Sequence, residues 1–338
     1  MAIDDAPGNG RSAERAELTR ELVDDLVRAA VAAPSKHNTQ PWRFRVDEAS
    51  QAVELYADAE RQLAYGDPDG RAVHIACGAA LFNFRLAAAV RGRQAVVQLL
   101  PDPGRPLLLA AIKLSGRCRA GDAEAELYAA IPHRRTNREP FSGRRVPPGV
   151  LAELIEAAAI EGAVLHILDH DETARVLELA AMAERDQLAD PRYRAELARW
   201  VGGDRDRDGI PAALLGPRSP DTPTPVRDFT PGHEPGKLRY AWFEEHPQLA
   251  VLATHASRRA DWLRAGQALE RVLLTATARG ISASPLTQPL ETSEAWLVRD
   301  PRSGAEQPQM ILRIGYGLPV QPSPRRPVVE VLDEARAS

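Results

Sequence analysis

The chain has 338 residues, enough to bury a large core and to hold two domains, and its formal net charge is −4. This charge argues against generic nucleic-acid binding, which needs a basic stripe. Cys77 and Cys118, the only cysteines, have no paired spacing, so they exclude a disulfide framework and fit a reducing compartment. The N-terminus lacks an apolar signal core, and no apolar run looks long enough to span a bilayer. We therefore expect a cytoplasmic protein without a membrane partner.

The N-terminal third of the chain predicts two helices and four strands. Thr19 is a suitable N-cap for a first helix, whose apolar residues recur at helical spacing until Pro34 stops it. A long helix is expected over about 71–91, ended by Gly92. Strand-like runs lie on both sides of that helix, at 42–46, 53–56, 95–100 and 107–114.

A polar loop at 34–42, Pro-Ser-Lys-His-Asn-Thr-Gln-Pro-Trp, joins the first helix to the first strand. Such a connection needs only one or two turn residues, whereas this loop offers hydrogen-bond donors and acceptors of every kind. Lys36 adds a movable cation. The pattern indicates a ligand site. The alternative is a polar loop packed on Trp42, with Lys36 at a solvated, variable position.

A second candidate site is the arginine run at 134–138, Arg-Arg-Thr-Asn-Arg. Each guanidinium can fork onto phosphate oxygens, and each charge-assisted bond contributes roughly 1.5–3 kcal/mol. Tyr128, Ile131 and Phe141 flank the run, which indicates that the chain enters the fold here. A solvated run in an arginine-rich chain is the alternative.

The long helix has a relative later in the chain. Residues 71–92 and 259–280 align over 22 positions, of which nine are identical, including the internal glycines Gly78 and Gly266. The offset of 188 residues is too long for a solenoid repeat and suits the duplication of a whole domain. Two Ala-rich core helices that agree by chance are the alternative.

These motifs resemble those of the nitroreductase superfamily, whose members bind FMN. The loop resembles the family's Pro-Ser-x-x-Asn-x-Gln-Pro-Trp sequence, and the arginine run resembles its Arg-Arg-Ser-x-Arg sequence. Nitroreductases are usually homodimers whose long central helices cross at the interface, and this chain resembles such a dimer fused end to end, as in the Acg branch. The resemblance implies an α+β, three-layer α-β-α fold. Its two halves, 1–125 and 126–338, would form an internal pseudo-dimer, so that a monomer is plausible.

The resemblance also implies a single FMN site across the internal interface, because each half carries only part of the motifs. In the first half it places these residues at the cofactor: Pro34, Ser35, Lys36, Asn38 and Gln40. In the second half it places Arg134 at the phosphate and Arg138 at the pyrimidine edge, with Arg135, Thr136 and Asn137 between them. A later turn would offer a backbone N–H to flavin N5 at Thr287 or Gln288. A basic residue near the C-terminus would meet the phosphate, Arg325 before Arg326. No catalytic side chain and no metal ligand is assigned.

Residues 202–236 are rich in Gly, Pro, Asp and Arg, and seven prolines interrupt any helix there. A long solvated loop is one interpretation. A structureless segment of this length inside a domain more often serves as a lid or binding loop. Its apolar residues Leu214, Leu215, Val226 and Phe229 could be buried. In the Acg branch a comparable insertion covers the flavin, and the resemblance implies the same here.

The resemblance implies an oxidoreductase in which NAD(P)H reduces FMN, and FMN reduces a small acceptor such as a nitro compound or a quinone. Two other functions need the same FMN contacts. One is a storage protein that keeps FMN beneath a closed lid with little turnover. The other is a biosynthetic flavoenzyme with a dedicated substrate. The sequence leaves these three functions open.

Overall fold

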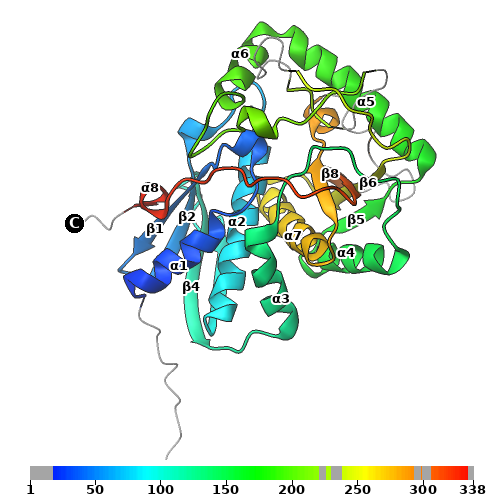
Figure 1. The fold of residues 1–338 in the computed structure, drawn as a ribbon. Coiled ribbons are helices and arrows are strands. Elements are labelled where there is room, and N and C mark those ends of the chain that lie inside the picture. The colour runs from blue at the N-terminus through cyan, green and yellow to red at the C-terminus, as the bar shows by residue number, and fades with distance from the viewer. Residues whose placement is uncertain (1–17, 221–225, 230–237, 293–297, 299–305, 334–338) are drawn as a thin grey trace, which may run out of the picture.

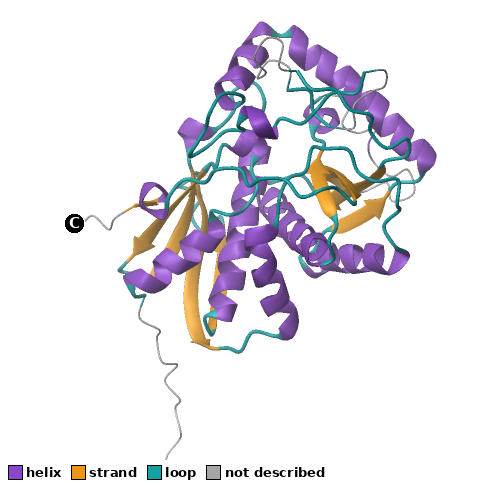
Figure 2. Ribbon diagram, viewed as in Figure 1, coloured by secondary structure: helices purple, strands orange, loops and turns teal. Residues whose placement is uncertain are grey.

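The computed structural model describes residues 18–220, 226–229, 238–292, 298 and 306–333. Its strands form two separate sheets on either side of a central group of helices (Figures 1 and 2). Each sheet is built mainly from one half of the chain. The fold is therefore α+β, as the sequence predicts.

The first half runs α-β-β-α-β-β. Its elements are α1 (Arg20–Ala30), β1 (Trp42–Asp47), β2 (Ala52–Ala57), α2 (Arg71–Val90), β3 (Arg93–Leu99) and β4 (Leu108–Arg117). All four predicted strands are present, with ends shifted by at most three residues. The Thr19 side chain caps α1 by accepting from the Leu22 N–H, and Gly92 follows α2 with a φ of 73°. Local sequence thus accounts for the limits of these helices.

The second half repeats this order of elements. It contains α4 (Pro148–Ile160), β5 (Val164–Ile167), β6 (Gln248–Thr254), α7 (Arg259–Ala278), β7 (Ser282–Pro285) and β8 (Gln307–Gly315). Its strands are ordered β7-β8-β6-β5, which matches β3-β4-β2-β1 in the first sheet, and every one of these neighbours is antiparallel. Between the halves, α3 (Asp122–Ala130) packs on both α2 and α7. The repeated topology supports the duplication of a whole domain.

The two long helices α2 and α7 cross at their paired glycines. A Cβ on Gly78 would lie 2.2 Å from the carbonyl oxygen of Leu263, and a Cβ on Gly266 would lie 2.0 Å from that of Ile75. Ile75 and Leu263 are themselves equivalent at the offset of 188. The contact is therefore reciprocal, as at a two-fold interface between identical subunits. Because only glycine permits this approach, the paired glycines produce the predicted internal pseudo-dimer.

The second-half sheet is covered by helices on both faces. Ala250 and Leu252 of β6 pack on one face in a cluster with α4 and α7. Leu249 and Val251, which alternate with them, pack on the other face against Val176 of α5 (His170–Ala189). This alternation gives the predicted three-layer α-β-α arrangement.

The first-half sheet packs its helices differently. Phe44 and Leu55 belong to one apolar cluster with α1 and α2. Glu54, whose side chain alternates with that of Leu55, instead pairs with Arg45 at 2.8 Å and with Arg105 at 3.0 Å. The helices of this half therefore pack on an apolar face, and the opposite face carries an ion-pair cluster.

An insertion and the C-terminal segment complete the fold. Between β5 and β6 the chain forms α5, α6 (Pro191–Trp200) and the segment 202–236, in the upper part of Figure 1. After β8 the chain returns to the first half, where α8 (Val328–Val331) leads into β9 (Leu332–Asp333), which pairs in parallel with β1. These last residues, which the sequence analysis placed in the second half, therefore extend the sheet of the first.

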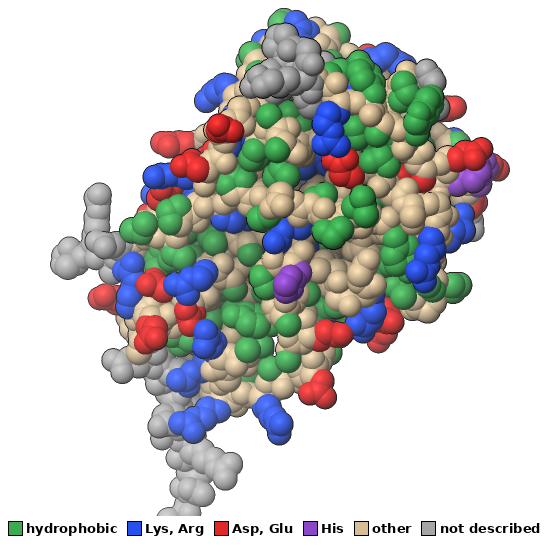
Figure 3. Space-filling view, viewed as in Figure 1, with side chains coloured by type: hydrophobic (Ala, Val, Ile, Leu, Met, Phe, Trp, Pro, Cys, Tyr) green, Lys and Arg blue, Asp and Glu red, His purple; other side chains and the backbone are tan. Residues whose placement is uncertain are grey.

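The burial of α2 and the distribution of surface charge both bear on the expectations from composition. By length and composition α2 could span a membrane, contrary to the expectation that no run was long enough, but 83% of its most apolar window is buried inside the protein. Burial on all sides explains why this core helix is apolar all round. On the face shown in Figure 3, acidic and basic side chains are interspersed.

Candidate functional site

Two adjoining cavities lie between the halves of the chain. The larger cavity, of about 430 Å³, is lined by the 34–37 loop, the start of α2, β7, β8 and the short helix η6 (Gln288–Glu291). The smaller cavity, of about 200 Å³, is lined by the same loop, the segment 131–138 and the C-terminal segment. Pro34, Ser35, Thr136 and Arg138 line both cavities, so the two adjoin in one site across the pseudo-dimer interface.

The loop after α1 has an unusual backbone. His37, Asn38 and Gln40 have φ angles of 50°, 55° and 51°, in the left-handed region that residues other than glycine seldom adopt. The N–H of Gln40 donates to Ser35 Oγ at 2.9 Å, and the fully buried Trp42 anchors the strand that follows. Backbone strain of this kind persists only where the surrounding structure enforces it, and it clusters at functional sites.

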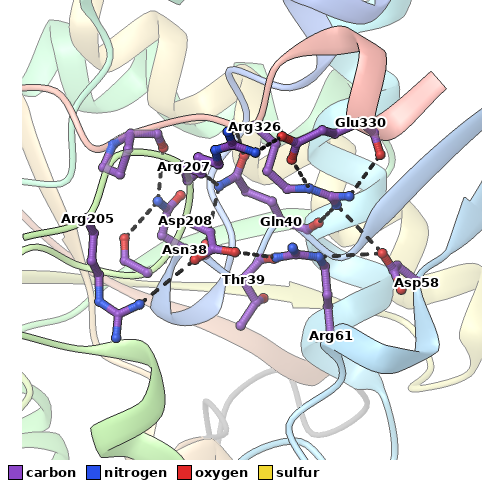
Figure 4. A network of polar contacts seen from close by, with 12 residues as sticks. Asn38, Thr39, Gln40, Asp58, Arg61, Arg205, Arg207, Asp208, Arg326 and Glu330 are labelled. Atoms are coloured by element: carbon purple, nitrogen blue, oxygen red, sulfur yellow. Dashed lines mark hydrogen bonds and ion pairs between the residues drawn. The ribbon is translucent and has the colours of Figure 1, made fainter.

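Gln40 and Arg326 hold this loop in place and do not line either cavity. Gln40 Nε2 donates to the Arg207 carbonyl at 2.7 Å, and its Oε1 accepts from the backbone N–H of Arg326 at 2.8 Å (Figure 4). The Arg326 guanidinium donates to the carbonyls of Gln40 and Glu330. Both side chains are engaged with the backbone of other segments, and their contact with the cofactor stays a prediction.

Asn38 lines the smaller cavity and ties the loop to two distant segments. Its Nδ2 donates to the Gly209 carbonyl at 2.9 Å and to the Pro324 carbonyl at 3.0 Å. Its Oδ1 accepts from Arg325 at 3.1 Å. One amide thus connects the loop, the insertion and the C-terminal segment at the wall of the cavity.

Four arginines line the smaller cavity: Arg134, Arg135 and Arg325, and also Arg138, which lines the larger cavity as well. Arg134 is only 5% exposed, and its Nε lies 3.7 Å from a carboxylate oxygen of Glu270. Burial, together with the nearby Arg134, lowers the pKa of Arg325 to about 9. The Nε atoms of Arg134 and Arg325 are buried without a hydrogen-bond partner among the described residues. This cluster of donors and positive charge fits an anion with several acceptor oxygens.

Of the other residues in the arginine motif, two line both cavities and one binds a backbone carbonyl. Thr136 and Arg138 line both cavities, whereas Asn137 lines neither. Asn137 Nδ2 donates to the Leu318 carbonyl at 2.8 Å, and its contact with the cofactor stays a prediction. The guanidinium of Arg138 lies over the Phe229 ring, 5.2 Å from its centroid, and burial lowers the pKa of Arg138 to about 10.

A buried ion cluster of Lys36, Arg227 and Glu291 forms one wall of the larger cavity. A Glu291 oxygen lies 2.7 Å from Lys36 Nζ and 3.0 Å from Arg227 Nη2, and each of the three side chains is at most 10% exposed. Burial opposes the ionisation of Glu291, but Arg227 and Lys36 outweigh it and hold the Glu291 pKa well below its ordinary value. Burial also lowers the pKa of Lys36, against the attraction of Glu291. Lys36 is thus a cavity residue, and the solvated alternative does not apply.

In the later turn, Thr287 lines the larger cavity and Gln288 does not. Thr287 Oγ1 accepts from Arg227 at 2.9 Å. Gln288 is 1% exposed and donates to Glu184 at 3.1 Å, and Glu184 does not line this cavity either. Of the two candidates for this turn, the structure therefore brings only Thr287 to the cavity.

Part of the segment 202–236 forms a wall of the larger cavity. Leu215 and Phe229 are buried in one cluster with Tyr193 and Leu197 of α6, as the apolar residues of this segment predict. Phe229 also lines the larger cavity, together with Arg227. Residues 221–225 and 230–236 of the predicted lid lie outside the described part of the chain.

Sequence reasoning missed His37, Arg227 and Glu291 as site residues. His37 is 6% exposed, lines the larger cavity and packs edge-on against Phe229 with 5.9 Å between ring centroids. Burial, and then the charges of Arg227 and Lys36, hold the His37 pKa well below its ordinary value, so its imidazole is neutral at pH 7. Its place inside the predicted loop was a usable signal. Arg227 and Glu291 stand in no motif, because only packing brings them together.

Side chains of both halves meet at the position that is pseudo-symmetric to the start of α2. Arg71 of α2 lines the larger cavity, whereas its equivalent Arg259 donates to His74 Nε2 at 2.9 Å and to the carbonyl of Pro106. His74 also packs edge-on against Trp262, its own equivalent at the offset of 188, with 5.4 Å between ring centroids. The two halves therefore differ in the contacts of this equivalent pair of arginines.

Comparison with known proteins agrees with this architecture. The nitroreductase family model matches residues 131–316. A Mycobacterium tuberculosis protein named as a candidate NAD(P)H nitroreductase is 38% identical over 321 residues, which cover 93% of this chain and 91% of the relative. The M. tuberculosis protein Acg, named in the same way, is 32% identical over 327 residues, covering 93% of this chain and 96% of its own. Among solved structures, a candidate nitroreductase from Anabaena variabilis has a TM-score of 0.50 and 11% identity over 88% of each chain, which supports the fold.

Proposed function

Because this chain belongs to the nitroreductase family, we propose that it is an FMN-dependent oxidoreductase that passes a hydride from NAD(P)H to a small acceptor, such as a nitro compound or a quinone. Family membership itself carries the oxidoreductase class. FMN, the acceptor and the roles of individual residues are the proposed part. The observation that supports them most directly is the pair of adjoining cavities, with an arginine cluster at one end and a mixed polar and apolar lining at the other.

The smaller cavity suits the phosphate of FMN. Arg134, Arg135 and Arg325 supply donors and positive charge, and Ser35 and Asn38 add further polar groups. Each guanidinium carries several N–H donors, which match the acceptor oxygens that a phosphate monoester carries. With roughly 1.5–3 kcal/mol for each charge-assisted bond, this end would provide a large share of the binding free energy.

The larger cavity suits the flavin ring. Ile75, Leu269 and Met310 supply apolar surface, while Lys36 and Arg138 supply positive charge. Bound there, FMN would provide the hydride chemistry. The chain's own residues would bind and orient the ring, exclude water and stabilise negative charge. In this proposal, Lys36 and Arg138 stabilise an electron-rich ring because they place positive charge in the wall of its cavity.

Cofactor stoichiometry and reduction test the proposal directly. The purified protein should retain FMN at no more than one per chain, because each half of the chain carries only part of the cofactor motifs. Flavin released by denaturation is quantified against protein. Anaerobic mixing with NADH or NADPH should then bleach the bound flavin. A ratio near two, or a protein that retains no FMN, would contradict the proposal.

One observation favours a second candidate function, FMN storage. Arg227 ties the wall formed by the inserted segment to the site through Glu291 and Thr287, and it also donates to Gln187 and Tyr193. A wall held by so many buried contacts could exclude a nicotinamide while it retains FMN. In a store, anaerobic NAD(P)H would not bleach the flavin until residues 210–236 are replaced by a short Gly/Ser linker. In the enzyme, the intact protein would bleach and the replacement would change only the rate or acceptor preference.

A further inference from the structure

Glu270 is a fully buried carboxylate on α7 where the two central helices cross, and none of the roles above uses it as an active group. Its Oε1 accepts a hydrogen bond from Asn83 of α2 at 3.0 Å and lies 3.7 Å from Arg134 Nε. Its Oε2 has no hydrogen-bond partner among the described residues. An ionised carboxylate in such a place is strongly unfavourable unless nearby cations compensate it.

The position of Glu270 is asymmetric within the pseudo-dimer. Its equivalent at the offset of 188 is Phe82, whose ring lies 5.7 Å from the Arg85 guanidinium and 5.0 Å from that of Arg271. At this helix position, an aromatic ring thus occupies one side of the pseudo-dimer. The carboxylate occupies the side that faces the arginine cluster of the smaller cavity. Duplication alone therefore does not explain Glu270.

The charges around the smaller cavity are unequal in number. Within the described ranges, Glu270 is the one carboxylate at ion-pair distance from Arg134, Arg135 or Arg325. The guanidinium groups of Arg134, Arg135 and Arg325 together with this one carboxylate carry a net charge of +2. Arg138 is left out of this count, because its guanidinium lies over Phe229 in the wall of the larger cavity. Burial raises the pKa of Glu270, and Arg134 opposes that rise. Arg134 also lowers the pKa of Arg325, which shows that the arginines repel one another.

We propose that Glu270 is the resident counter-ion of the smaller cavity and adjusts the charge of that cavity to that of a phosphate dianion. The inference rests on the proposed FMN site. A phosphate monoester carries a charge of about −1.5 to −2 at pH 7, so it would neutralise a cluster of net charge +2. Glu270 reduces the repulsion among the arginines before the ligand binds. After binding, it repels the phosphate and moderates the affinity.

The test compares FMN with riboflavin, which lacks the phosphate. Glu270→Gln keeps the side-chain size and an oxygen for Asn83, but it raises the net charge to +3. We expect a lower melting temperature in the absence of ligand, FMN affinity at least threefold tighter, and riboflavin affinity changed less than twofold. Glu161→Gln is the matched control, because Glu161 is a buried partner of Arg85 and Arg271 on the Phe82 side. This control should lower stability and leave both affinities unchanged.

Each outcome bears on the inference. Equal weakening of FMN and riboflavin by Glu270→Gln would show a packing role and overturn the counter-ion proposal. Selective weakening of FMN binding would show that Glu270 acts by orienting Arg134. An unchanged melting temperature with unchanged affinities would show that Glu270 carries no charge. Either result would also overturn the counter-ion proposal. If wild-type protein binds FMN no better than riboflavin, the proposed FMN site fails instead.

If Glu270→Gln does not fold, a second substitution that removes one positive charge provides the test. Arg135 is only partly buried, so Arg135→Gln should fold, with a net charge of +1 and FMN affinity at least threefold weaker. The double variant Arg135→Gln/Glu270→Gln returns the net charge to +2. It should fold and bind FMN within twofold of wild type. Failure of the double variant to fold, or FMN affinity no better than that of Arg135→Gln, would overturn the proposal.

Discussion

Replacing Glu291 with glutamine should destabilise the protein strongly. The substitution keeps the shape of the side chain but removes the negative charge between Lys36 and Arg227, whose side chains are 9% and 7% exposed. Breaking a buried pair by removing one partner costs about 3–5 kcal/mol, because the remaining charge is left uncompensated in a poorly solvated place. Here two cations would face each other without their shared partner.

This cost converts into a measurable shift in melting temperature. A chain of 338 residues has an unfolding entropy of about 0.7 kcal/mol/K near the transition, so about 3–5 kcal/mol corresponds to a fall of about 4–7 °C. The assay is thermal unfolding of both proteins followed by circular dichroism. Glu126→Gln is the matched control: Glu126 also pairs with an arginine, Arg279, at 2.6 Å, but its side chain is 48% exposed. Its loss should leave the transition almost unmoved.

The pH dependence provides a second check on the same reasoning. The pKa of Glu291 is depressed in the folded protein, so its ion pairs stabilise the fold above the unfolded pKa of about 4.3 and lose that effect as pH falls further. The stability gap between wild type and Glu291→Gln should be constant from pH 6 to 8 and should close below about pH 4.3. A gap under 1 kcal/mol at pH 7, or one that persists unchanged to low pH, would refute the assignment.

Two further predictions follow from the site and the helix crossing. Arg134→Ala should weaken FMN binding at least tenfold and leave riboflavin binding almost unaffected, as measured by flavin fluorescence quenching. The reason is that roughly 1.5–3 kcal/mol per bond is lost only when the phosphate is present. Equal effects on both ligands would show that Arg134 does not contact the phosphate. Gly266→Ala should lower the melting temperature markedly because its Cβ would lie 2.0 Å from a carbonyl oxygen, whereas Gly143→Ala, with no atom within 4 Å, should not; a tolerated Gly266→Ala would contradict the crossing geometry.

The sequence alone determined the features that depend on neighbours along the chain. Thr19 and Gly92 mark the limits of helices because a capping side chain and a left-handed residue act within one turn. The crossing of α2 and α7 was also visible in the sequence. A pair of glycines at equivalent positions, Gly78 and Gly266, is a local requirement for close backbone approach even though the two helices are far apart in the chain.

The sequence also located most of the candidate site. It did not distinguish the residues that line the cavities from those that bind the backbone of other segments. The loop and the arginine motif contain Ser35, Lys36 and Arg138, which line the cavities. They also contain Gln40 and Asn137, whose amides instead bind the backbone of other segments. An amide in a motif can serve either role, since its hydrogen-bonding capacity is the same in both. The partner that reaches it in the folded chain decides between them.

Only the tertiary structure decided where charge is buried. Lys36, Arg227 and Glu291 come from three distant parts of the chain, and Glu270 meets Arg134 only because α7 passes the arginine motif. None of these pairs has a spacing that a sequence pattern could reveal. Burial of a charge is favourable only when a partner arrives from elsewhere, so the electrostatics of the site are a property of packing, whereas caps, turns and helix faces are properties of local sequence.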